Sequence, residues 1–129
     1  MNRLTPRSAR TRVRTTRYCR AVVESRPDRP GTVWVSFSGE FDMDSRPVLQ
    51  AVSEDVGGAH VVADVSGVAF ADSSFLHFLL DIRHRLVLAD EVPRQLARLF
   101  LLTCTTTLFT YAPDPTHPDG RAGPSEGAR

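Results

Sequence analysis

One acidic residue and two serines join two apolar segments near the middle of the chain, and these side chains could do chemistry. Asp72, Ser73 and Ser74 stand between the strand-like stretch 61–70 and the apolar run 75–80. Asp and Ser at the start of a helix accept hydrogen bonds from the free N–H groups of its first turn, which stabilises the helix by about 0.5–2 kcal/mol. The simplest interpretation is therefore a helix cap, although one such residue would suffice and three are present.

Two other functions fit a serine at this position. As a catalytic nucleophile, Ser73 would need a base, and His77 and Asp81 follow it at helical spacing. No G-x-S-x-G motif is present, and such a helix face is more often solvated, so we do not expect an enzyme. As a phosphorylation site, Ser73 would place the phosphate at the positive end of a helix dipole, which tolerates it. The added negative charges would still alter any surface that docks there.

Strand and helix patterns alternate around this joint. Asp44 is expected to cap the first helix, and Gly57 and Gly58 to end it. The alternation predicts an α/β fold, with a mixed, largely parallel sheet of four to five strands packed with helices. Trp34 and four phenylalanines are assigned to the core, at positions 37, 70, 78 and 100. The expected strands are 19–25, 32–39, 60–66, 86–90 and 106–112, and the expected helices are 44–56, 73–85 and 92–104.

The two ends of the chain differ from its centre in composition. Residues 1–18 are rich in Arg, Thr and Ser and predict a disordered arm, whereas residues 112–129 contain four Pro and three Gly and predict a disordered tail. One domain is therefore expected at 19–111. Residues 1–20 carry seven Arg and no acid, whereas the rest has nine Arg and fifteen Asp or Glu. The acidic core is a poor partner for nucleic acid, although the arm could bind nucleic acid or an anionic membrane surface.

Composition also bears on compartment and cofactors. No apolar run reaches the roughly 18–20 residues of a membrane span, and no apolar segment follows the first arginines, so we expect a cytoplasmic protein with no membrane partner. Cys19 and Cys104 predict neither a disulfide framework nor a metal site, and the four histidines are scattered. No glycine-rich phosphate loop is present, so the chain does not read as a kinase, and no cofactor or metal is expected.

Several motifs occur together in a familiar order. Residues 39–42, Gly-Glu-Phe-Asp, close a strand, and residues 64–66, Asp-Val-Ser, lie in a hydrophobic strand. Residues 70–74, Phe-Ala-Asp-Ser-Ser, open the next helix, and residues 86–100 provide a strand and a further helix. This series resembles the STAS domain, the fold of bacterial anti-sigma factor antagonists, over residues 20–111.

The resemblance implies a function for the serine. In that family the unmodified antagonist binds an anti-sigma factor, which is itself a serine kinase, and so releases a sigma factor. Phosphorylation of the first serine, here Ser73, breaks the complex, and a PP2C-type phosphatase restores it. Asp72 would cap the helix and orient Ser73, and Ser74 would be a second cap hydroxyl. Asp42 would either help to position the kinase or cap the next helix.

The chain departs from the family pattern at two places. The family's glycine after the two serines is Phe75 here, which either turns into the core or reshapes the docking surface. We group Phe75 with Asp42, Asp72 and Ser74 as expected partner-binding residues. The segment between Asp72 and Pro93 is also about two helical turns shorter than in the family. The alternatives are a STAS scaffold without phosphorylation and a nucleic-acid-associated regulator that uses the arginine arm.

Overall fold

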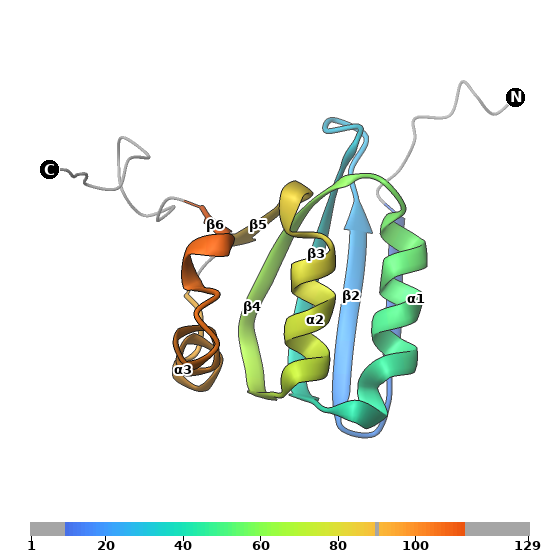
Figure 1. Cartoon of the computed structure of the whole chain (residues 1–129). Coiled ribbons are helices and arrows are strands. Elements are labelled where there is room, and N and C mark those ends of the chain that lie inside the picture. Colours follow the sequence, from blue (N-terminus) through green and yellow to red (C-terminus); the bar gives the residue numbers. More distant parts are fainter. Residues whose placement is uncertain (1–9, 90, 113–129) are drawn as a thin grey trace, which may run out of the picture.

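The computed structural model describes residues 10–89 and 91–112. Within them, six strands form one sheet in the order β1-β2-β3-β4-β5-β6 (Figure 1). Strand β2 pairs antiparallel with both β1 and β3, and β3 to β6 run parallel. The strands are β1 (Arg10–Thr15), β2 (Cys19–Ser25), β3 (Thr32–Phe41), β4 (His60–Ala71), β5 (Leu86–Ala89) and β6 (Thr110–Tyr111), and the helices are α1 (Arg46–Val56), α2 (Ser73–Asp81) and α3 (Arg94–Leu102).

Three helices connect the parallel strands. Helices α1 and α2 lie side by side over one face of the sheet, and both begin at the end where β3 and β4 end (Figure 1). The period of two in the strands supplies an apolar face, so Val35 and Phe37 are buried whereas Ser36 and Ser38 between them are exposed. The expected mixed, largely parallel α/β fold is confirmed, although with six strands instead of four to five.

An aromatic cluster fills the space beneath α2. The ring of Phe75 lies 4.8 Å from that of Phe41 and 5.2 Å from that of Phe37, measured between centroids. Phe78 completes the cluster, 5.8 Å from Phe37. Such aromatic pairs add to the stability gained from burial alone. The assignment of Phe37 and Phe78 to the core is confirmed, as is that of Phe100.

Two aromatic side chains assigned to the core are not in it. Phe70 is 43% exposed near the end of β4. Trp34 is only partly buried, because its ring faces away from the helices and is covered by arginines instead. The guanidinium carbons of Arg26 and Arg29 lie 4.0 Å and 5.6 Å from the ring centroid. These cation–π contacts let a large ring remain on a face that no described helix covers.

The expected disordered arm is wrong for residues 10–15. They form β1, which pairs with β2 along its whole length. The arginines and threonines alternate, but neither face of this strand is apolar, so hydrophobic periodicity did not reveal it. Residues 1–9 of the arm and 113–129 of the tail lie outside the described residues.

Several element boundaries also differ from expectation. Asp42, not Asp44, is the first cap, and it opens a short 3₁₀ turn, η2 (Met43–Ser45), from which α1 continues. Strand β4 extends to Ala71, and α2 ends at Asp81, followed by the 3₁₀ turn η3 (Arg83–Arg85). Segment 106–112 is mainly the turn η4 (Thr106–Leu108) before the two residues of β6.

Helix α3 takes the place of a strand beside the end of β4. Strand β5 pairs only with residues 61–64 of β4, which leaves the later residues without a partner on that side. The side-chain amide of Gln95 donates to the Ala71 carbonyl and accepts from the Ala71 N–H, each at 2.9 Å. These two hydrogen bonds are the kind that a neighbouring strand would make. They lie one residue before Asp72 and so hold the start of α2 in place.

Candidate functional site

The ends of β3 and β4 bring two aspartates to the same edge of the sheet. Asp42 and Asp72 directly follow these strands, and the N–H of Asp72 donates to the carbonyl of Phe41 at 3.0 Å. Each carboxylate accepts a hydrogen bond from the backbone N–H two residues later, at 2.9 Å for Asp42 and 2.8 Å for Asp72. Both are therefore helix caps, as expected for Asp72 and as one of two interpretations of Asp42.

Ser73 is the first residue of α2, and its side chain is exposed. Among the described residues, its hydroxyl forms no hydrogen bond, because the capping bond comes from Asp72 to the N–H of Ser74. Ser74 is partly buried in the same turn. The Ser73 hydroxyl is therefore accessible to another protein and is not needed to cap its own helix.

A groove of about 400 Å³ runs between α1 and α2, and Ser73 is one of the residues that line it. Leu49 and Phe78 provide its apolar walls, and the other side chains are mainly polar. Met43, at the start of the α1 side, is 65% exposed. The groove is lined by Met43, Arg46, Leu49, Gln50 and Ser53 from η2 and α1, and by Ser73, Ser74, His77, Phe78 and Asp81 from α2.

Sequence reasoning missed the contribution of the α1 side to this site. Met43 and Arg46 come from a segment read only as a helix start, whereas the structure places them across the groove from α2. The only signal in the sequence was a methionine directly between two acids after a predicted strand. The structure exposes this methionine, which leaves it free to contact a partner.

The serine, histidine and aspartate of α2 share the groove without being connected. Ser73, His77 and Asp81 all line it, as their helical spacing requires. No hydrogen bond links any two of them in the part of the chain that the structure describes. The catalytic interpretation therefore gains no support from the geometry.

Phe75 does not belong to the docking surface. Its side chain is fully buried in the aromatic cluster, so the expectation that it contacts a partner is wrong. The position faces the sheet because it lies two residues after Ser73, which points outward. Of the two possibilities for this departure from the family pattern, the structure shows the first, in which the ring turns into the core.

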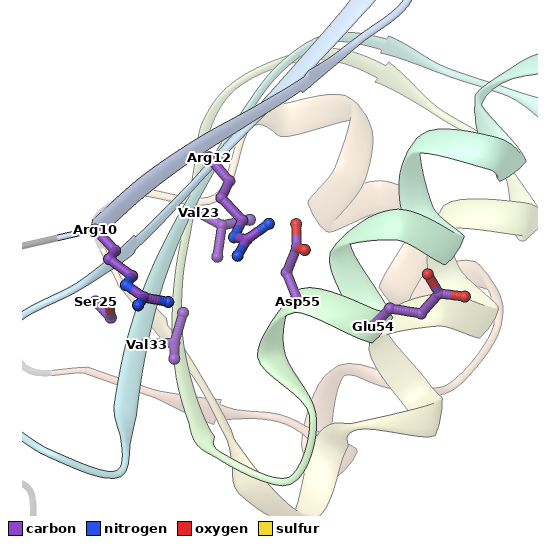
Figure 2. A pocket seen from close by; sticks show the side chains of 7 residues that line it. All are labelled: Arg10, Arg12, Val23, Ser25, Val33, Glu54 and Asp55. Carbon is purple, nitrogen blue, oxygen red and sulfur yellow. The ribbon is translucent and has the colours of Figure 1, made fainter.

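A second pocket, of about 240 Å³, lies between β1 and the end of α1. Figure 2 shows the Arg12 side chain reaching toward Asp55 across it, whereas the carboxylate of Glu54 points away. Arg14, on the same strand, donates two hydrogen bonds to Asp55, at 2.7 Å and 2.8 Å. These bonds hold the pKa of Asp55 below its ordinary value. The arginines of β1 therefore attach that strand to the domain.

In residues 10–89 and 91–112, no group of three or more His, Cys, Asp or Glu side chains could hold a metal ion. None of the helices described is long and apolar enough to cross a membrane.

Comparison with known proteins identifies the fold. No protein-family model and no curated protein sequence matches the chain. Its structure does match the crystal structure of an anti-sigma factor antagonist from Mycobacterium paratuberculosis. The TM-score is 0.53 and the sequence identity 24%, and the match covers 88% of this chain and 91% of the other. The chain has the STAS fold.

The Gly-Glu-Phe-Asp motif has a structural role in this fold. Gly39 has a φ of 97°, and a Cβ there would overlap the carbonyl oxygen of Tyr18, which accepts a hydrogen bond from Glu40. The backbone at the start of β2 therefore approaches β3 closely at the first residue of Gly-Glu-Phe-Asp, and the last residue of this motif, Asp42, is a cap. The resemblance found in the sequence is confirmed at the level of the fold, whereas the roles of individual site residues remain predictions.

Proposed function

We propose that the protein is an anti-sigma factor antagonist. It binds an anti-sigma factor kinase at the Ser73 end of the α1–α2 groove and so releases a sigma factor in the bacterial cytoplasm. The observation that carries this proposal is the Ser73 hydroxyl, exposed and without a hydrogen-bond partner among the described residues, in a chain with the STAS fold. The protein acts by binding and not by catalysis, and needs no cofactor.

Phosphorylation of Ser73 ends this activity. The anti-sigma factor supplies ATP, and the Ser73 oxygen attacks its γ-phosphorus. An O–P bond forms as the bond from the γ-phosphorus to the bridging oxygen breaks, and ADP leaves with that electron pair. The serine proton passes to a base of the kinase. A PP2C-type phosphatase later hydrolyses the phosphoserine with water, which releases inorganic phosphate and regenerates the hydroxyl.

The neighbouring residues present this hydroxyl. Asp72 holds the first turn of α2 through Ser74, so the orientation of Ser73 does not depend on its own side chain. Asp42 holds η2 in the same way and thereby places Met43 at the groove. We assign Met43 to the interface as an apolar anchor, because a methionine adapts its shape to a partner surface.

The proposed interface explains why a single phosphate is sufficient. An exposed serine in the centre of a contact is neutral and small, whereas phosphoserine carries about two negative charges at pH 7. Desolvating these charges costs several kcal/mol, and each 1.4 kcal/mol changes the dissociation constant tenfold. The acidic caps Asp42 and Asp72 lie near the same surface and add to the repulsion of an acidic partner surface.

The test uses anti-sigma factors encoded in the same genome. Each is incubated with the protein and ATP, and the modified residue is mapped by mass spectrometry. We expect one phosphate on Ser73, none on Ser73→Ala, and ordinary labelling of Ser74→Ala, which removes the adjacent hydroxyl as a matched control. Labelling of Ser73→Ala, or no binding and no labelling with any of these proteins, would overturn the proposal.

A further inference from the structure

The groove beside Ser73 is lined by two side chains that can donate hydrogen bonds to a phosphate, Arg46 and His77, and neither is paired with an acid among the described residues. Arg46 is the first residue of α1, Ser73 is the first residue of α2, and His77 lies one turn further along α2. All three line the same groove. The two ion pairs found among the described residues, Arg14–Asp55 and Arg26–Glu24, involve neither Arg46 nor His77.

We propose that phosphoserine 73 is bound in cis by Arg46 and His77, so that phosphorylation fills the α1–α2 groove from within. This inference rests on the proposed function, since it requires a phosphate on Ser73. It adds a second effect to charge repulsion, because the phosphate then occupies the surface on which the partner would dock.

The helix geometry brings these groups within reach of one another. Residues four apart on a helix have Cβ atoms about 5–6 Å apart, which is the relation of Ser73 to His77. Long side chains on a helix lean toward its N-terminus, so His77 extends toward the first turn, where Ser73 lies. Helices α1 and α2 begin at the same end of the sheet (Figure 1). Arg46 and Ser73 are the first residues of these two helices, and both line the groove between them.

The position of Arg46 is otherwise unfavourable. A cation at the first residue of a helix is repelled by the positive end of the helix dipole. Arg46 is exposed, and its guanidinium forms neither a hydrogen bond nor an ion pair within the described residues that would offset this effect. A phosphate supplies the missing negative charge, and a guanidinium can donate two parallel hydrogen bonds to it.

The acidic groups near the site leave room for this arrangement. Asp72 directs one carboxylate oxygen to the N–H of Ser74, at the cap, and Asp81 lines the groove one turn beyond His77. A phosphate that pointed straight out from Ser73 would remain close to Asp72. Rotation into the groove moves it toward the Arg46 guanidinium and the His77 ring instead, so the charge of Arg46 and the hydrogen-bond donors of both side chains favour the bound orientation.

The experiment installs phosphoserine at position 73 during translation, so no kinase is required. The phosphorus NMR shift is followed against pH in the otherwise wild-type protein, in Arg46→Gln, in His77→Gln and in the double variant. Arg98→Gln, which removes an exposed arginine on α3, is the matched control. All four altered positions, 46, 73, 77 and 98, are on the surface, and circular dichroism verifies that each variant is folded.

We expect the phosphate of the otherwise wild-type protein to titrate at lower pH than that of the double variant, by at least about half a unit, because the nearby arginine charge and hydrogen-bond donors favour the dianion. Arg98→Gln should leave the midpoint unchanged. Equal midpoints in the otherwise wild-type protein and in the double variant would overturn the proposal. If the cis contact is found but no kinase phosphorylates Ser73, the proposed function fails by itself; if the kinase switch works with equal midpoints, only this inference fails.

Discussion

Replacing Phe75 by the glycine of the family pattern should severely destabilise this chain. Phe75 is fully buried and packs against Phe37, Phe41 and Phe78. Truncation of a buried Phe to Ala costs about 3–5 kcal/mol, since apolar contacts are lost and a cavity remains. Glycine in a helix costs up to about 1 kcal/mol more than alanine. The expected loss is therefore about 4–6 kcal/mol, as large as the whole stability of many domains.

Urea unfolding measures this loss directly. For an m-value of about 1.5 kcal/mol/M, the midpoint for Phe75→Gly should fall by about 3–4 M, and the variant is expected to be largely unfolded in buffer. Phe75→Leu keeps most of the volume and should lose far less. The control is Phe70→Ala, which truncates an exposed phenylalanine five residues earlier and should change stability by no more than about 0.5 kcal/mol. A midpoint for Phe75→Gly within about 0.5 M of wild type, a change as small as that of the control, would refute the conclusion that the buried Phe75 ring stabilises the core.

Three further changes test the supports of the site. Gly39→Ala should destabilise the domain by at least about 1–3 kcal/mol, because alanine is strained at the positive φ of Gly39 and its Cβ would meet the backbone at the start of β2. Gly58→Ala is the control, because a Cβ at Gly58 would lie in open space, and thermal melting compares the two variants. Gln95→Ala leaves the N–H and C=O of buried Ala71 unpaired and should cost about 1–3 kcal/mol, with faster hydrogen exchange at Ala71. The pKa of Asp55 is lower in the folded protein than in the unfolded chain, where it is about 3.9. The Asp55 carboxylate therefore stabilises the fold above the unfolded pKa, and this effect is lost as pH falls through the folded pKa. The difference in unfolding free energy between wild type and Asp55→Asn should accordingly disappear in acid.

Local patterns were sufficient to predict the parts of the fold that have an apolar side. Strands β2, β3 and β4 alternate or run continuously apolar, α1 has apolar residues at helical spacing, and α2 follows a clear cap, so their existence and order were predicted. The cap at Asp72 was predicted for the same reason, because its chemistry is local. The short strand β6 was expected within a longer segment whose first half is a turn.

The remaining features depend on contacts between distant residues. Strand β1 has no apolar face, and it is held by pairing with β2 and by Arg14–Asp55, which joins residues 41 positions apart. The burial of Phe75 could not be decided from its own segment, since it depends on how Phe37 and Phe41 pack from another strand. The groove depends likewise on the placement of α1 beside α2.

The most direct test of the central claim is a comparison of two dissociation constants. Unmodified protein and protein carrying phosphoserine at position 73 are titrated against the anti-sigma factor identified by the labelling experiment. The account predicts that the phosphorylated form binds at least about 100-fold more weakly, which corresponds to about 2.8 kcal/mol. Equal affinities would contradict it, because Ser73 would then lie outside the interface.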